Sequence, residues 1–162
     1  MTESEKMAKG EWYFATDKLL VQQRMRAKTQ CFDFNHTSPG SASERKKILK
    51  QLLPNAPSAW IEPSFYCDYG FNVHAKGALF INHNVSILDG ALVTFGRNVF
   101  IGPSTVIAAT SHPMEADSRA RGLCRSLPIM IGNDVWIGAN VTIVGGAVID
   151  DGSVIGANSL VK

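Results

Sequence analysis

The chain has 162 residues, of which 45% are hydrophobic and 19% charged, and its formal net charge at pH 7 is +2. This composition is that of one ordinary globular domain and argues against intrinsic disorder. Acidic and basic residues are mixed along the chain, so nothing in the charge pattern favours a nucleic acid or an anionic membrane as partner.

Three cysteines, Cys31, Cys67 and Cys124, lie far apart, and none belongs to a Cys-x-x-Cys pair. They predict reduced thiols rather than a disulfide framework or a zinc knuckle. The amino terminus is polar, and no apolar run approaches the roughly 18 residues that a membrane span requires. We therefore expect a soluble, cytoplasmic protein.

Residues 1–57 are expected to form a helical segment. Asp17 stands before the apolar run Leu19-Leu20-Val21 and opens one candidate helix. Ser41, followed three positions later by Glu44, has the spacing of a capping box for a second helix, which Pro54 would end.

Residues 58–162 follow a different, six-residue period. Apolar residues recur at this spacing, with two extra residues before Phe95 and one longer interruption, at Ala75, Ile81, Ile87, Phe95, Ile101, Ile107, Ile131, Ile137, Ile143, Ile149, Ile155 and Val161. Neither an α-helix nor a simple strand has this period. Units of six residues describe a parallel β-helix of triangular section, in which three short faces make one coil of about 18 residues. Counted from Tyr69 to Val161, the units predict a column of roughly four coils.

The interruption covers residues 113–130, which we expect to leave the column as one ejected loop. His112 stands at the point of exit, in the stretch Ser111-His112-Pro113. A lone histidine before a proline is usually a surface or turn residue, so its role depends on the surrounding pattern.

Several stretches resemble the maltose and galactoside O-acetyltransferases, a subfamily of the left-handed β-helix acyltransferases: CDYGFNVHAKGALFINHNVSILDG, SHPMEADSRARG and PIMIGNDVWIGANVTIVGGAVIDDGSVIGANSLV. WYFATD, RMRAKT and FDFNHTSP, nearer the amino terminus, resemble the helical leader of that subfamily. The resemblance implies a left-handed β-helix, a homotrimer, acetyl-coenzyme A as cosubstrate without a metal, and a small sugar as acceptor.

The same resemblance implies the roles of individual residues. His112 matches the general base, which accepts the proton of the acceptor hydroxyl, a task suited to imidazole near neutral pH. Asn82 matches an asparagine that stabilises charge on the attacked thioester carbonyl or holds the acceptor. Without the resemblance, Asn82 would read as part of an asparagine ladder at a coil corner. The matched acceptor contacts are Asp17, Arg24 and Asp68.

Coenzyme A is expected along the carboxy-terminal coils, in a groove between two subunits. The matched positions are Trp136, Ala139, Ala157 and Lys162. Relatives usually continue beyond the position of Lys162, so we expect weaker cofactor binding here.

Two positions depart from the family pattern. Gly90 stands where galactoside acetyltransferases carry a second aspartate after the one that matches Asp89, which puts galactoside specificity in doubt. Cys124 follows Gly122-Leu123, where relatives carry glutamate. If that carboxylate orients the histidine, His112 needs another partner, for which a backbone carbonyl is a candidate.

Three other functions remain open at this point. The chain could be a non-catalytic or weakly active trimeric scaffold, or it could acetylate a non-sugar acceptor, because a fold does not fix its substrate. A zinc-dependent hydratase of the same fold would need three histidines around one ion. The unit count places His74 and His112 two coils apart and His83 on another face, which argues against a zinc site within one subunit.

Overall fold

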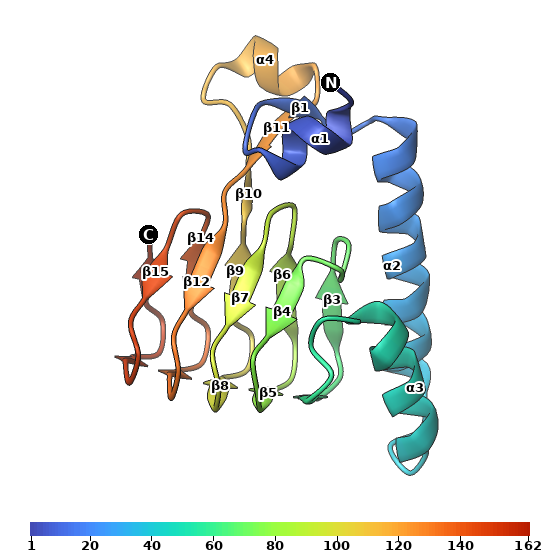
Figure 1. Cartoon of the computed structure of the whole chain (residues 1–162), viewed down its shortest axis with the longest axis vertical. Coiled ribbons are helices and arrows are strands. Elements are labelled where there is room, and N and C mark those ends of the chain that lie inside the picture. The colour runs from blue at the N-terminus through green and yellow to red at the C-terminus, as the bar shows by residue number, and fades with distance from the viewer.

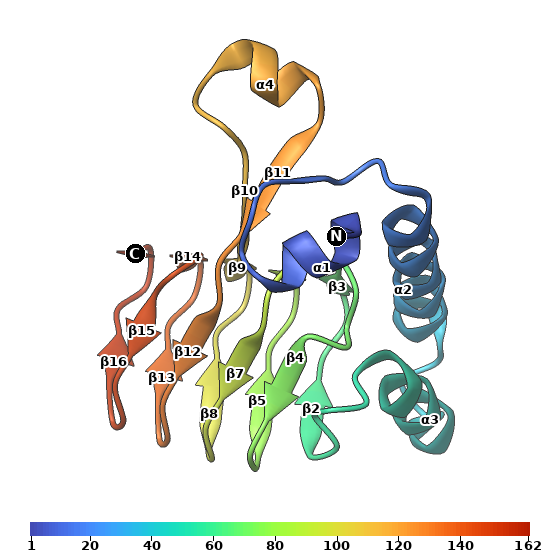
Figure 2. The same cartoon turned by 45° about the horizontal axis from the view of Figure 1, so that its top comes forward.

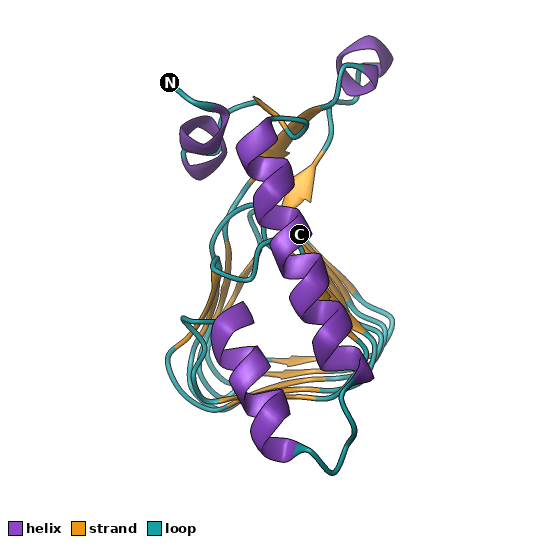
Figure 3. Ribbon diagram, turned by 90° about the vertical axis from the view of Figure 1, so that its right-hand side faces the viewer, coloured by secondary structure: helices purple, strands orange, loops and turns teal.

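The computed structural model describes residues 1–162 and contains a three-sided column of parallel strands with helices packed at one end (Figure 1). The leader comprises α1 (Glu3–Ala8), β1 (Tyr13–Phe14), α2 (Lys18–His36) and α3 (Ala42–Leu52). The predicted β-helix of triangular section is confirmed, and its outline is visible in the end view of Figure 3.

Each side of the column is one parallel sheet. The first face has five strands: β2 (Ala59–Ile61), β5 (Leu79–Ile81), β8 (Val99–Ile101), β13 (Trp136–Ile137) and β16 (Val154–Ile155). The second face also has five: β3 (Phe65–Cys67), β6 (Val85–Leu88), β9 (Val106–Ala108), β14 (Thr142–Val144) and β17 (Leu160–Val161). The third has four: β4 (Val73–Ala75), β7 (Val93–Phe95), β12 (Ile129–Ile131) and β15 (Val148–Ile149).

The six-residue period becomes a vertical register inside the column. On the first face the aligned residues are Ile61, Ile81, Ile101, Ile137 and Ile155. On the second they are Cys67, Ile87, Ile107, Ile143 and Val161, and on the third Ala75, Phe95, Ile131 and Ile149. Most of these side chains are buried in one core, and each isoleucine removed from water contributes about 1.5–3 kcal/mol.

The column is about one coil taller than the repeat predicted. β2 and β3 form an additional layer below the first recognisable hexapeptides. Their inward residues include Phe65, which is larger and less regular than the aliphatic repeat residues. The six-residue repeat is therefore recognisable in the sequence only beyond β2 and β3, although these strands already belong to the column.

The two long helices cover the end of the column formed by β2 and β3 (Figures 2 and 3). α2 begins where predicted, because the Asp17 side chain accepts hydrogen bonds from the first free N–H groups of the helix. The predicted capping box at α3 is wrong: Ser41 is the N-cap, but its side chain makes no capping hydrogen bond. Buried leader residues that complete the core are Ala27, Cys31, Phe34, Leu52 and Leu53.

The excursion leaves the column between β9 and β12. It consists of β10 (Thr110–Ser111), α4 (Ala116–Ala120) and β11 (Leu123–Ser126), and it projects from the side of the column (Figure 2). β11 pairs antiparallel with both β10 and the leader strand β1. The ejected loop is thus tied to the amino-terminal segment, a contact that neither pattern predicts alone. No helix in the structure has the length and apolarity needed to cross a bilayer.

Candidate active site

Most of the candidate residues lie at or near two of the three edges of the column. The Asp68 edge joins the second face to the third and comprises turns 68–72, 89–92 and 145–147 together with the excursion. The Asn82 edge joins the first face to the second and comprises turns 62–64, 82–84, 102–104, 138–140 and 156–158. The second face separates these two edges.

His112 directly follows β10 and is exposed to solvent. Its Nδ1 lies 3.4 Å from the carbonyl oxygen of Leu123 and 3.5 Å from the sulfur of Cys124. A carbonyl oxygen only accepts hydrogen bonds, so this contact places the proton of neutral imidazole on Nδ1. Nε2 then carries a free lone pair that faces no partner within the chain, which is the arrangement that a general base requires.

The leader and the first coil meet at a buried tyrosine. Arg24 donates from Nη1 to the Tyr69 hydroxyl at 2.7 Å and from Nη2 to the Ala15 carbonyl at 2.6 Å. Burial raises the pKa of Tyr69 to about 12, against the opposing effect of Arg24. Two N–H donors of Arg24 therefore link α2 to Tyr69 and to Ala15, and its other donors remain free for an acceptor substrate.

The two candidate carboxylates are also partly engaged. Oδ1 of Asp17 accepts from Leu19 and Leu20 N–H at 3.0 and 3.2 Å as the cap of α2, while its second oxygen has no partner in the chain. Asp68 is half-buried, and desolvation raises its pKa while the charges of Arg24 and Lys28 lower it. Asp68 therefore combines a restricted position with access to solvent.

Behind these residues lies a cluster of three hydroxyl groups. The Ser126 hydroxyl is 2.9 Å from that of Tyr13 and 3.0 Å from that of Thr110. The cluster fills the space next to Gly90, where an added Cβ would lie 2.3 Å from both Ser126 Oγ and Thr110 Oγ1. In this structure a side chain at position 90 would therefore require the cluster to move.

Asn82 and Asn84 differ in role along the Asn82 edge. Asn84 has a positive φ of 61° and donates from Nδ2 to Ser104 Oγ at 3.2 Å, so Asn84 is the turn and ladder residue. Asn82 only caps the adjacent amide, accepting from His83 N–H at 2.7 Å, and its Nδ2 has no partner within the chain. Because this amide donor is free, Asn82 and not Asn84 has the capacity to bind a ligand.

The expected cofactor residues share the first face and the Asn82 edge. The outer side of the first face carries one apolar column in register, formed by Trp60, Phe80, Phe100, Trp136 and Val154. Trp136 is 59% exposed, so its indole is available to a ligand. Ala139 and Ala157 occupy successive turns of the Asn82 edge, whereas Lys162 ends the chain after β17 on the second face. An exposed indole beside open backbone turns suits the apolar arm of coenzyme A.

One chain does not bring all the candidate residues together. His112, Asp17, Arg24 and Asp68 gather at the Asp68 edge, whereas Asn82 and the expected cofactor residues other than Lys162 lie on or near the Asn82 edge. The second face between them is about six extended residues wide, or up to roughly 20 Å. His112 and Asn82 can therefore act on one substrate only if a second copy of the chain contributes.

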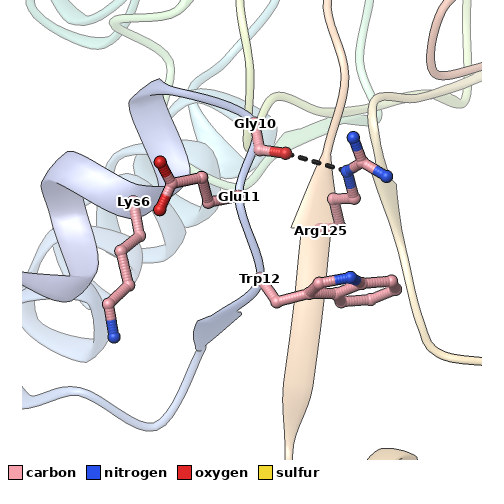
Figure 4. Close-up of a pocket in the computed structure, with 5 residues that line it drawn as sticks. All are labelled: Lys6, Gly10, Glu11, Trp12 and Arg125. Atoms are coloured by element: carbon pink, nitrogen blue, oxygen red, sulfur yellow. Dashed lines mark hydrogen bonds between the residues drawn. The ribbon is translucent and has the colours of Figure 1, made fainter.

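One cavity of the single chain lies close to these residues without including them. A cavity of about 540 Å³ lies between the leader and the outer side of β11 (Figure 4), lined by Lys6, Gly10, Glu11, Trp12 and Arg125. Trp12 and Arg125 adjoin Tyr13 and Cys124, which pair across β1 and β11, but side chains alternate along a strand, so Trp12 and Arg125 face the opposite side of that sheet. The chain also forms no cluster of three or more histidine, cysteine, aspartate or glutamate side chains with the geometry of a metal site.

Sequence reasoning assigned no role to two residues of this region. Tyr69 links Arg24 to the coil, and the buried Asp89 carboxylate binds the turn at Asp68. Burial raises the pKa of Asp89 to about 7, although hydrogen bonds from the Tyr69 and Gly70 amides oppose that rise. Both residues lie in the stretches that carry the resemblance, but a pattern of residue types gives no direction for their side chains.

Comparisons with known proteins agree with the fold described above. Residues 6–57 match the maltose acetyltransferase hexapeptide capping motif, and residues 128–162 match the bacterial transferase hexapeptide. The galactoside O-acetyltransferase of Escherichia coli (strain K12) is 38% identical over 99% of this chain and 80% of its own length. A maltose O-acetyltransferase structure from Clostridium difficile 630 superposes with a TM-score of 0.96 at 38% identity, covering 100% of this chain and 87% of that one. A galactoside acetyltransferase in complex with coenzyme A gives a TM-score of 0.90 at 36% identity, covering 98% and 80%.

Proposed function

Since the chain belongs to the maltose and galactoside O-acetyltransferases, left-handed β-helix enzymes that use acetyl-coenzyme A, we propose that it acetylates a hydroxyl group of a small sugar with His112 as general base. The observation that carries this proposal is the contact of His112 Nδ1 with the Leu123 carbonyl, which leaves Nε2 free at the edge where Arg24 and Asp68 gather. The sugar acceptor is proposed because similar proteins are a galactoside O-acetyltransferase and a maltose O-acetyltransferase.

The proposed chemistry needs one proton acceptor and one donor to the developing oxyanion. His112 Nε2 takes the proton of the acceptor hydroxyl as its oxygen bonds to the acetyl carbonyl carbon. The Asn82 Nδ2 group, which has no partner within the chain, donates to the carbonyl oxygen as negative charge builds there. When the carbon–sulfur bond breaks, the proton on His112 passes to the leaving thiolate of coenzyme A. The base is then regenerated.

Acceptor recognition is assigned to the side chains around Arg24. The free oxygen of Asp17, the remaining donors of Arg24 and the half-buried Asp68 offer both acceptors and donors to the hydroxyl groups of a sugar. Each hydroxyl of a sugar can donate and accept, so a mixed set of this kind suits it better than a purely apolar pocket. Because Gly90 offers no side chain, glucose and maltose are proposed as better acceptors than a galactoside.

We propose a homotrimer in which the site forms between neighbouring copies. The second face carries the outward residues Tyr66, Ser86, Val106, Thr142 and Leu160, of which Tyr66 and Leu160 are more than half exposed. If three copies turn this face toward a common threefold axis, the Asp68 edge of each copy meets the Asn82 edge of the next. That closed arrangement supplies His112 from one copy and Asn82 from its neighbour.

The reaction is tested by mixing the protein with acetyl-coenzyme A and glucose, maltose or a simple galactoside and following release of free thiol. His112→Ala should lower kcat about 10²- to 10⁴-fold without loss of the trimer. Undiminished turnover in that variant would remove His112 from the mechanism.

The shared site is tested by subunit mixing. Asn82→Ala should also be nearly inactive, while trimers reassembled from equal amounts of His112→Ala and Asn82→Ala chains should regain about one quarter of the sites, since half of each required edge is intact. Mixing without recovery, in trimers shown by mass spectrometry to contain both chains, would contradict a site formed between subunits.

A further inference from the structure

Asp89 is the only carboxyl group among the buried residues of the chain. Its relative exposure is 0%, and no lysine, arginine or histidine forms an ion pair with it. Removing a carboxylate from water without a cation costs several kcal/mol unless its oxygens are fully hydrogen-bonded. The burial of the Asp89 carboxylate without a cation therefore needs a specific structural or functional explanation.

The oxygens of Asp89 are satisfied almost entirely by one turn of backbone. Oδ1 accepts from the N–H groups of Asp68 at 3.0 Å and Tyr69 at 2.8 Å. Oδ2 accepts from Gly70 N–H at 2.7 Å and Asn72 N–H at 3.3 Å. The Asn72 side chain also donates to the Asp89 carbonyl at 2.7 Å. Five hydrogen bonds therefore fix turn 68–72 to the coil above it.

The fold does not need a carboxylate to make this edge. Nearer the carboxy-terminal end of the column, the same edge turns through Gly145, Gly146 and Ala147, where no carboxylate caps the backbone. Turn 68–72 differs from that turn because it carries residues proposed to recognise the acceptor substrate. It presents Asp68, and its Tyr69 receives the hydrogen bond of Arg24.

The turn is held from its other side as well. Gly70 has a φ of +82°, and an added Cβ there would lie 2.1 Å from the Leu52 carbonyl oxygen at the end of α3. The backbone of the turn thus lies between α3 and the Asp89 carboxylate. A continuous chain of contacts then runs from Asp89 through Tyr69 and Arg24 to Ala15, two residues before Asp17.

We propose that Asp89 is a positioning residue for acceptor recognition: its carboxylate gathers the amides of turn 68–72 and thereby fixes Asp68 and the Tyr69–Arg24 link relative to His112. This inference rests on the proposed function of the site and adds to it a residue that touches neither substrate. Asp89 acts only through the turn it holds, on the acceptor side of the reaction and not on the cofactor side.

Asp89→Asn is the informative change, because it keeps the shape of the side chain but turns one acceptor oxygen into a donor that faces amide donors. In the full-length trimer at pH 8, with the acceptor that the wild-type enzyme turns over fastest, the acceptor KM should rise about tenfold or more. The KM for acetyl-coenzyme A should stay within about twofold, because turn 68–72 lies three coils along the column from the expected cofactor residues Trp136 and Ala139. Hydrogen exchange should accelerate at the amides of residues 68–72.

Asp151→Asn is the matched control. Asp151 also caps a turn, accepting from Asn133 N–H at 2.6 Å, but it is exposed and lies on the third edge of the column. This variant should leave both KM values unchanged. If Asp89→Asn does not fold, Asn72→Ala can be used instead. It removes the hydrogen bond from Asn72 Nδ2 to the Asp89 carbonyl, one of the five that hold turn 68–72, and should give a smaller rise in acceptor KM alone.

The outcomes separate this inference from the proposed function. An unchanged acceptor KM in Asp89→Asn, or in Asn72→Ala where the first variant does not fold, overturns the positioning role even if His112→Ala is inactive. A parallel rise in both KM values, in a variant that melts like the wild type, also overturns it. Full activity of His112→Ala together with a selective rise in acceptor KM would instead remove the proposed base and keep the positioning role.

Discussion

The thiol of Cys124 lies 3.5 Å from the Nδ1 atom of His112, and its sulfur is also 3.9 Å from the carbonyl oxygen of Gly122. Burial raises the pKa of Cys124, so near neutral pH the residue is a thiol and not a thiolate. The S–H group can donate only to an acceptor, and with Nδ1 protonated by its contact with Leu123 the Gly122 carbonyl is that acceptor. The imidazole therefore rests against two neutral groups and no carboxylate.

A carboxylate at position 124 should make His112 a stronger base. In Cys124→Asp, a negative charge near Nδ1 would favour the protonated imidazole, so the acid limb of the kcat/KM profile should move to higher pH. Cys124→Ala, which adds no charge, should leave that limb in place and lower kcat only a few-fold. The measurement is kcat/KM between pH 5 and 9. A profile of Cys124→Asp that coincides with that of Cys124→Ala would contradict the contact.

Arg24→Lys should loosen the leader although it conserves the charge. A lysine has no planar fork and cannot donate to Tyr69 and Ala15 from two nitrogens at once. We expect a loss of about 1–3 kcal/mol in the free energy of unfolding, measured by urea denaturation, and a raised acceptor KM. Arg26→Lys, at an exposed position of the same helix, is the control and should change neither quantity. Equal stability of the two variants would show that the fork contributes little.

The sequence predicts the column well because its signal is periodic. With three six-residue units to a coil, every third unit returns to the same face, and Ile81, Ile101 and Ile137 stack in register on one face. The six-residue repeat does not extend to the layer of β2 and β3. Its inward residues, Phe65 among them, pack against α2 on one side, whereas those of an inner coil pack between two other coils. Periodicity reports only the parts of a fold that repeat.

The site was less accessible to such reasoning, for two physical reasons. The sequence resemblance points to His112 and Asn82, but their separation by the second face depends on which edge each turn occupies in three dimensions. Asp89 and Tyr69 matter through the direction of single hydrogen bonds, which residue identity does not give. The contact of β1 with β11, which brings Tyr13 opposite Cys124, involves two short strands without a periodic signal.

Gly90→Ala should destabilise the protein through packing. The new Cβ would meet the hydroxyls of Ser126 and Thr110 at 2.3 Å and would force apart a buried hydrogen-bonded cluster. We expect a loss of about 1–3 kcal/mol in the free energy of unfolding, read from urea denaturation. Gly40→Ala is the matched control, because its Cβ would approach nothing closer than Ser38 Oγ at 3.9 Å. If both variants unfold at the same urea concentration as the wild type, the hydroxyl cluster is more mobile than its contacts indicate.

Trp136→Ala should weaken binding of acetyl-coenzyme A and leave folding nearly unchanged. The indole is 59% exposed, so its removal creates no cavity, and the free energy of unfolding should change by less than about 1 kcal/mol. The KM for acetyl-coenzyme A should rise several-fold, because an exposed apolar surface that a ligand covers contributes to affinity and not to the fold. Trp60→Ala tests the same chemistry at the other end of the first face: Trp60 is 61% exposed and stands three strands away, about 14 Å at the spacing of parallel strands. That variant should keep the wild-type KM for acetyl-coenzyme A, and an equal rise in the two variants would mean that the whole apolar column, and not its carboxy-terminal end, receives the cofactor.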